Sequence, residues 1–334
     1  MNQSSKDDSD SISRRDFLFR SVKAGALVVA AGGVSYWLYD VKGPDPVSKP
    51  GGELAVLPDF SVADLGGRMS VISGEDRVKT LHAGLKAIGG IESFIRKNDR
   101  VLIKVNAAFA TPPVLSATTN PRLVSEVIDL CFKAGASSVV VTDNPINDPQ
   151  SCFALSGIGE AARAAGAKLM LPTSGSFAPT TVPKGKLIRD WPLLYAPFEG
   201  INKLIGIAPV KDHHRSGASM AMKNWYGLLG GRRNVFHQNI NEIILELAMM
   251  VKPTLVILDG TTTMMTNGPT GGSLSDLKQT NCMIVSTDQV AADAFGASLL
   301  GKKPVDLPFI LKARDAGVGT ADYESLSPVR ESSG

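Results

Sequence analysis

Helix-like and strand-like patterns of apolar residues alternate along this chain. Over residues 80–98, apolar side chains recur close to the 3.6-residue helical period, which predicts a helix with one buried face. Residues 100–105 follow as a short apolar run typical of a buried strand. Asn120 with Pro121 is typical of a helix start and Gly135 of a helix end, so we expect a second helix over 123–134.

The alternation continues through the C-terminal half. Further strands are expected at 139–142, 168–171, 204–210, 254–258 and 283–286. Further helices are expected at 159–165, 240–251 and 289–300. Continuous apolar strands between helices are typical of parallel sheets covered on both faces. The sequence therefore predicts an α/β fold with a largely parallel sheet flanked by helices.

Composition divides the chain into segments. Residues 1–40 have the features of an export signal, and 41–60, rich in Gly, Pro and Ser, are expected to form a linker. The α/β domain is expected over 61–310, followed by a C-terminal tail over 311–334. If the domain has two lobes, the polar stretch near 173–200 is the expected boundary.

Charge and cysteine content exclude several classes of protein. The 334 residues carry a net charge of only +3, too small an excess for nucleic acid to be the main partner. The three cysteines have no C-x-x-C spacing, which argues against a disulfide framework, a thiolate zinc finger and a cysteine-ligated iron–sulfur cluster.

The N-terminal segment resembles a twin-arginine export signal. Arg14 and Arg15 precede Phe17, Leu18 and an uncharged apolar run over 24–39, and only Phe19 departs from the pattern S-R-R-x-F-L-K. This resemblance implies the twin-arginine translocase as a partner and a periplasmic or other extracytoplasmic location. Bulky residues at 34–39 do not form a small-x-small cleavage site, and an uncleaved signal would tether the protein to the membrane.

Polar or ionisable residues follow five predicted strands. Ligands of open parallel sheets bind beyond the carboxyl ends of the strands, so we expect these residues to share one rim. The alternative is that an aspartate at such an end only caps the next helix, above all Asp288. The residues at the five strand ends are Lys104 with Asn106, Asp143 with Asn144, 211–215, Asp259 and Asp288.

Three of the four histidines, His213, His214 and His237, fall within 25 residues. They are candidate metal ligands for a divalent ion or candidate acid/base groups, although adjacent His213 and His214 are expected to point in different directions. A shared metal would require His237 to return toward them. The alternatives are a polar cleft lining or anion binding together with Arg215, Arg232 and Arg233.

Lys223 lies in the motif K-N-W-Y-G at 223–227, beside apolar residues and Asn224. A lysine held among apolar groups loses its proton readily and can act as a base or nucleophile, whereas a lysine that reaches solvent would do neither. In the loop 267–272, backbone N–H groups of Gly268 and Gly271 could cradle a phosphate or carboxylate. The loop fits neither nucleotide-binding glycine motif, and a flexible surface turn is the alternative.

Several ordered motifs resemble the family called domain of unknown function 362. They lie at 101–106, 118–121, 134–141, 223–227, 259–269 and 288–293, and the resemblance covers about 71–301. Many members resemble or carry ferredoxin-type iron–sulfur modules, from which this chain departs because it lacks a cysteine cluster. A more remote similarity to nickel-pincer lactate racemases would make Lys223 the cofactor lysine, His237 a later histidine and His213 or His214 the neighbour of the metal.

Together these patterns predict an exported protein that binds a small anionic ligand in a cleft at the strand ends. They leave open whether a divalent metal is also bound there. In this hypothesis Lys223 is a base or anchor, the histidines are ligands or acid/base groups, and Asp143 and Asp259 orient the ligand or bind metal. The other hypothesis is a non-catalytic ligand-binding or redox-accessory protein that is exported folded.

Overall fold

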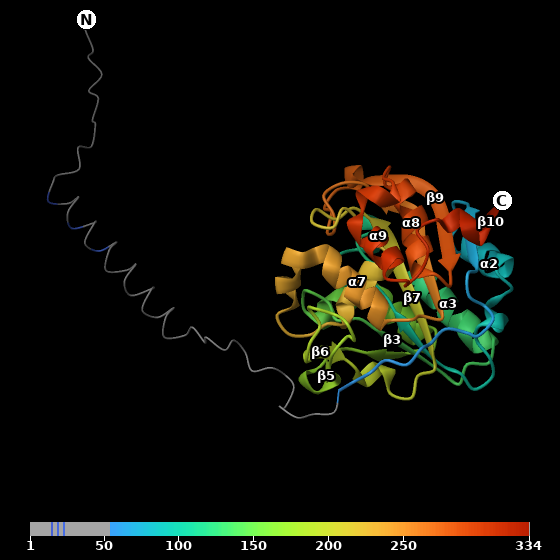
Figure 1. Ribbon diagram of the computed structural model, residues 1–334, viewed down its shortest axis with the longest axis horizontal. Coiled ribbons are helices and arrows are strands. Elements are labelled where there is room, and N and C mark those ends of the chain that lie inside the picture. Colours follow the sequence, from blue (N-terminus) through green and yellow to red (C-terminus); the bar gives the residue numbers. More distant parts are fainter. Residues whose placement is uncertain (1–14, 16–18, 20–22, 24–53, 334) are drawn as a thin grey trace, which may run out of the picture. The chain divides into compact units, whose positions relative to one another are not determined.

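The computed structural model describes residues 54–333 together with Arg15, Phe19 and Lys23 (Figure 1). Apart from these three residues, the predicted export signal over 1–40 lies outside the described residues, as does most of the linker over 41–60. All elements named below belong to one compact unit, Val47–Gly334. Within the described part of the chain, no helix is both long enough and apolar enough to cross a membrane.

The main sheet has eight strands in the order β10-β1-β9-β8-β7-β2-β3-β4. Every neighbouring pair is parallel except the two made by β9, which runs antiparallel to both β8 and β1. The predicted largely parallel sheet is therefore confirmed. The strands are β1 (Met69–Ser73), β2 (Arg100–Lys104), β3 (Ser138–Thr142), β4 (Lys168–Met170), β7 (Lys203–Lys211), β8 (Leu255–Met264), β9 (Leu277–Ser286) and β10 (Val329–Ser332).

Helices cover both faces of this sheet because successive residues of each strand point to opposite sides. In β2, Val101 and Ile103 join one apolar core and Leu102 joins the other. Helices α2, α3 and α5 bury their apolar sides in the first core, and α6 to α9 in the second. The helices are α2 (Arg77–Ala87), α3 (Pro121–Lys133), α4 (Pro149–Leu155), α5 (Ile158–Ala164), α6 (Ala221–Asn224), α7 (Ile240–Met250), α8 (Gln289–Leu299) and α9 (Pro308–Asp315).

Local signals explain where the helices begin and end. Asn120 caps α3 by accepting a hydrogen bond from the Arg122 backbone, and Gly135, with φ of 99°, follows its end. The single helix predicted over 80–98 is wrong beyond Ala87. Two glycines with positive φ at 89 and 90 end α2, and the chain resumes as a short 3-10 turn that still buries its apolar side chains.

Two predicted strands are longer than expected. Strand β8 continues past Leu258 to Met264 and pairs with β9, which already begins at Leu277.

Residues 173–200 contain a separate two-stranded sheet of β5 (Phe177–Thr180) and β6 (Trp191–Leu194). The stretch 311–334 contains β10, which pairs with β1 at the edge of the main sheet.

Candidate functional site

A cavity of 520 Å³ opens where β2, β3 and β7 end. Parallel strands direct their following loops to the same edge, so residues distant in sequence meet there. The volume lies within the range of small-molecule sites. Its lining combines cationic, imidazole and amide side chains with apolar ones, and includes Asn106, Phe109, Asp143, Asn144, Ile146, Lys211, His213, His214, Arg215, Lys223, Asn224, Tyr226, Arg233 and His237.

A buried ion pair forms the floor of the site. Lys104 Nζ, at the end of β2, lies 2.7 Å from Asp143 Oδ1, which follows β3. Backbone N–H groups of Ala107 and Asn144 also donate to the Asp143 carboxylate. Burial lowers the pKa of Lys104, and the charge of Asp143 opposes that shift. The one carboxylate that lines the cavity is thus already neutralised by a partner behind it.

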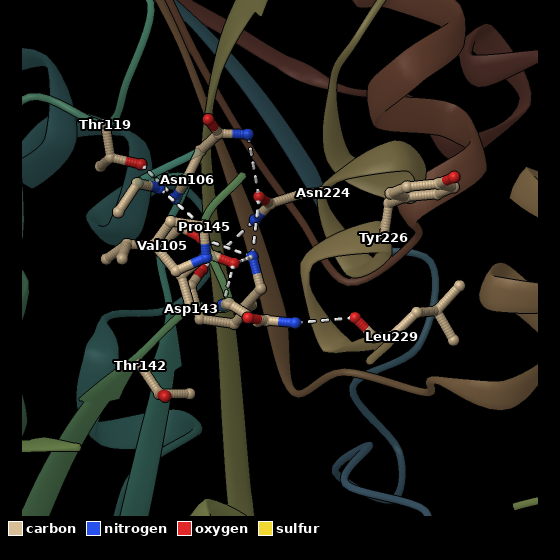
Figure 2. A network of polar contacts seen from close by, with 12 residues as sticks. Val105, Asn106, Thr119, Thr142, Asp143, Pro145, Asn224, Tyr226 and Leu229 are labelled. Atoms are coloured by element: carbon tan, nitrogen blue, oxygen red, sulfur yellow. Dashed lines mark hydrogen bonds and ion pairs between the residues drawn. The ribbon is translucent and has the colours of Figure 1, made fainter. Parts of the chain in front are cut away.

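Two asparagines tie this floor to α6 (Figure 2). Asn224 Oδ1 accepts hydrogen bonds from Lys104 Nζ and Asn106 Nδ2, while its Nδ2 donates to the backbone oxygens of Lys104 and Ile207. Figure 2 shows Asn224 facing Asn106 with Asp143 below them. Both polar atoms of the Asn224 side chain are engaged in these hydrogen bonds, so Asn224 serves to position the floor. Asn106 Nδ2 keeps one N–H, which is more accessible to a ligand than any group of Asn224.

Glycine is required at position 227 of the K-N-W-Y-G motif. A Cβ there would overlap Asp143 Oδ1 and lie 2.9 Å from Lys104 Nζ. The backbone of Gly227 also accepts a hydrogen bond from the N–H of Asn144. The close approach of this backbone to the ion pair therefore explains the last residue of the motif.

Lys211 and Lys223 place two further amines in the cavity wall. Lys211, the last residue of β7, donates to Asn106 Oδ1 and the Ala117 carbonyl. Lys223 Nζ lies 5.1 Å from the centre of the Tyr226 ring. Burial lowers the pKa of each lysine to about 7, helped for Lys211 by the charge of Lys223 and for Lys223 by the charge of Arg233. Both amines therefore titrate near neutral pH.

A buried carboxyl group holds the short helix that carries Lys223. Asp293 of α8 accepts hydrogen bonds from the backbone N–H groups of Ala221 (2.7 Å) and Met222 (3.1 Å), the first residues of α6. Burial raises the pKa of Asp293 to about 8, although both hydrogen bonds oppose the shift. This contact orients α6 toward the cavity.

The three clustered histidines meet at the cavity, and their rings are parallel. The ring centres of His213 and His214 are 5.0 Å apart, and those of His213 and His237 are 6.0 Å apart, with interplanar angles of 7° and 5°. The expectation that His213 and His214 point in different directions is wrong. The chain leaves β7 before His213 and forms a turn, which is closed by the hydrogen bond from the Gly217 N–H to the His213 carbonyl. Both side chains line the same cavity.

The hydrogen bonds of His213 do not fit a metal ligand. Its Nδ1 accepts from the backbone N–H groups of Arg215 and Ser216, so the ring proton lies on Nε2 and neither nitrogen has a free lone pair. In addition, the nitrogen atoms of stacked parallel rings lie in separate planes, so their lone pairs do not point toward one metal ion. Among the described residues, no group of three or more His, Cys, Asp or Glu side chains could hold a metal ion.

Arg233 anchors the wall between Tyr226 and the loop after β3. Its guanidinium donates to four backbone oxygens, those of Asn144, Pro145, Tyr226 and Leu229. Burial lowers the pKa of Arg233, while the charge of Asp143 opposes this shift. Arg215, in contrast, is an exposed residue on the rim. The site therefore has one structural and one accessible arginine.

Four other predicted residues lie outside this arrangement. Asp259 is inside β8, not at its end, and pairs with Arg77 at 2.7 Å on the α2 side of the sheet. Asp288 lies at the opposite edge, because β9 is antiparallel, and it caps α8 as the alternative predicted. The backbone N–H of Gly268 donates to Asp212 and that of Gly271 to Asn267, so both N–H groups already have acceptors in the protein.

All three cysteines are buried, and none of them forms a disulfide bond. Burial raises the pKa of Cys131 to about 12 and that of both Cys152 and Cys282 to about 11. Cys152 lies in α4. None of the three lines the main cavity.

Comparison with known proteins agrees with the motifs that surround this site. The family model described as domain of unknown function (DUF362) matches residues 101–298, more than half of the chain. The chain belongs to the DUF362 family. The matched region contains the Lys104–Asp143 floor and the helix that carries Lys223, so the cavity is part of the DUF362 domain.

Individual relatives of this DUF362 protein are distant. A thylakoid-associated protein of Synechocystis sp. is 22% identical over 258 residues, which cover 75% of this chain and 78% of that protein. Among solved structures, the lactate racemase apoprotein of Thermoanaerobacterium thermosaccharolyticum is similar with a TM-score of 0.40 and 13% identity, over 70% of this chain and 57% of that one. A Thermotoga maritima protein gives a TM-score of 0.32 and 11% identity, over 56% and 51% of the two chains.

Three side chains that shape the DUF362 cavity are not among the candidates that the sequence predicts individually. Lys211 is predicted only as part of a strand end, and the aromatic residues Phe109 and Tyr226 have no predicted role. The position of Lys211 at the end of a continuous apolar strand does indicate that it is buried, because the strand around it is buried along its length. No comparable signal marks Phe109.

Proposed function

We propose that this protein binds a small organic anion in the cavity at the ends of β2, β3 and β7. The observation that supports this is an imbalance of charge among the lining residues. Lys211, Lys223 and Arg215 face the cavity, whereas the one lining carboxylate, Asp143, is paired with Lys104. An anion would restore the balance of charge in the cavity.

The ligand class that fits best is a small carboxylate with a second polar group. Lys211 has a remaining N–H for a carboxylate, and the neutral His213 offers an Nε2–H donor. Phe109 and Ile146 in the lining provide apolar contact for a short carbon skeleton. A shared metal ion is not part of this proposal, because the rings of His213, His214 and His237 are stacked and do not converge on one point.

Calorimetric titration with pyruvate, propionate and inorganic phosphate tests this proposal. We expect Lys211→Met to weaken binding of the preferred anion, while Lys168→Met, an exposed lysine on β4, leaves it unchanged. Affinity should fall as the pH rises through about 7, because the two cavity amines then lose their charge. Absence of binding by all three anions, or binding insensitive to Lys211→Met, would contradict the proposal.

Export by the twin-arginine translocase is also proposed, and it is supported by the sequence motif at 13–18. The Synechocystis relative is described as thylakoid-associated, which is compatible with a protein that works at or across a membrane. We expect replacement of Arg14 and Arg15 by lysine to retain the protein in the cytoplasm. Fractionation of cells that express the full chain would reveal this, and unchanged export of the variant would contradict it.

A further inference from the structure

The amine of Lys223 differs from those of the other two buried lysines of the site. Lys104 is paired with Asp143, and Lys211 donates to two oxygens. Lys223 is only 8% exposed and lines the cavity, yet its Nζ makes no hydrogen bond or ion pair with any residue in the described range 54–333. Its contact is with the face of the Tyr226 ring.

An amine in this position is available for chemistry. With its pKa lowered to about 7 by burial and by Arg233, a large fraction of Lys223 is neutral at neutral pH. A neutral amine with a free lone pair is a nucleophile, and desolvation in an apolar wall favours that form. The anchoring of α6 by Asp293 restricts where the amine can go.

His213 is a neutral hydrogen-bond donor. Two backbone N–H groups occupy its Nδ1, which leaves the proton on Nε2. Burial and the charge of Lys223 lower the pKa of His213 to about 2, so the ring stays neutral at physiological pH. A neutral imidazole N–H can polarise a carbonyl oxygen and stabilise the negative charge that develops on it.

His237 has the opposite tautomer. The Tyr226 hydroxyl gives its hydrogen to the Arg233 carbonyl, so Tyr226 Oη can only accept from His237 Nδ1, which lies 3.2 Å away. Nδ1 is also 3.2 Å from the Asn234 carbonyl, a second acceptor. The proton of neutral His237 is therefore on Nδ1, and Nε2 has a free lone pair. Burial lowers the pKa of His237, which keeps this nitrogen available as a base.

We propose that Lys223 Nζ forms an imine with the carbonyl group of a small 2-oxo acid whose carboxylate occupies the anion site. This inference rests on the proposed function, since the carboxylate brings the carbonyl to the amine. A 2-oxo acid combines the two features that the lining recognises, a negative charge for Lys211 and an electrophilic carbon for Lys223.

The step balances without an added oxidant or reductant. The Lys223 lone pair bonds to the carbonyl carbon, and the carbonyl π electrons move to the oxygen, which His213 Nε2–H stabilises. The nitrogen then loses one proton to His237 Nε2, and His237 passes this proton to the oxygen, which becomes the hydroxyl of a carbinolamine. The second N–H proton moves by the same route to the hydroxyl, which leaves as water while the nitrogen lone pair forms the C=N bond. The products are the imine and one water molecule.

Reductive trapping on the full chain tests the inference. Protein is incubated with pyruvate or glyoxylate and sodium cyanoborohydride, and its intact mass and peptide map are recorded. We expect a single adduct, equal to the mass of the acid less one oxygen atom, on Lys223. Propionate should suppress trapping by competing for the anion site. Butanal, which has the carbonyl but no carboxylate, should label Lys223 much less than glyoxylate does.

Matched variants separate the imine from simple binding. Lys223→Met should abolish the adduct, and Lys168→Met should retain it. Lys223→Arg preserves a cation but cannot form an imine, so it should bind pyruvate without an adduct. An adduct that persists in Lys223→Arg, or labelling spread equally over surface lysines, would overturn the imine. Binding without any adduct would overturn it and leave the proposed function standing, whereas neither binding nor adduct would overturn both.

Discussion

Burial of the Lys223 amine should cost the folded protein stability. Its pKa is lowered from 10.5 to about 7, so at neutral pH the unfolded chain binds a proton more strongly than the folded chain does. At about 1.4 kcal/mol for each pKa unit, a difference of roughly three units at pH 7 corresponds to about 4 kcal/mol. We therefore expect Lys223→Met, which retains the length and apolar contacts of the side chain, to raise the free energy of unfolding by up to about 4 kcal/mol.

The direction of the pH dependence follows from the same shift. The cost is fully present at and below the folded pKa of about 7, and it disappears as the pH rises toward the unfolded value of 10.5. The gain in stability from Lys223→Met should thus be largest near pH 7 and below, and should shrink steadily in alkaline solution. Lys168→Met on the exposed edge of the sheet is the control, for which we expect little change.

These differences can be measured by urea unfolding between about pH 6 and pH 9, monitored by tryptophan fluorescence. Both variants and the parent protein are compared. Linear extrapolation at each pH gives the free energy of unfolding. A Lys223→Met variant that is less stable than the parent at pH 7, or whose gain does not change with pH, would refute the conclusion that this amine is desolvated and unpaired.

The remaining predictions concern the floor of the site and the thiols. Asp143→Asn should lower the free energy of unfolding by about 3–5 kcal/mol, because it leaves the buried Lys104 without a counter-charge. The double variant with Lys104→Met should recover part of that loss in urea unfolding, and no recovery would argue against the ion pair. Gly227→Ala should weaken pyruvate binding and lower the melting temperature, since its Cβ overlaps Asp143; retention of both would show that the backbone can move. Native protein should not react with a thiol-specific disulfide reagent until it unfolds, because the thiols are buried with raised pKa values, and fast labelling would contradict this for Cys131, Cys152 and Cys282.

Local patterns were enough to predict most elements of the sheet and its two helical layers. A buried strand needs a continuous apolar run and a covering helix needs an apolar stripe, and both can be recognised in a single stretch of sequence. Errors occurred where the pattern is compatible with more than one backbone. The apolar period over 80–98 continues beyond the two glycines that end α2, and β8 continues past Asp259 because a polar residue can remain in a strand when Arg77 pairs with it.

The sequence alone determined the α/β architecture, the membership of the DUF362 family and the meeting of Lys104, Asp143 and His213 at one edge of the sheet, since parallel strands bring their ends together. The same rule failed for Asp259, which lies inside β8, and for Asp288, which follows an antiparallel strand. Only the tertiary structure decided which charges are paired, which proton each histidine carries and that Lys223 has no partner among the described residues. These properties depend on strand register and on how individual side chains are placed after folding, whether their partners are near in sequence, as for His213, or far, as for Arg77 and Asp259. No local pattern of residues encodes that placement.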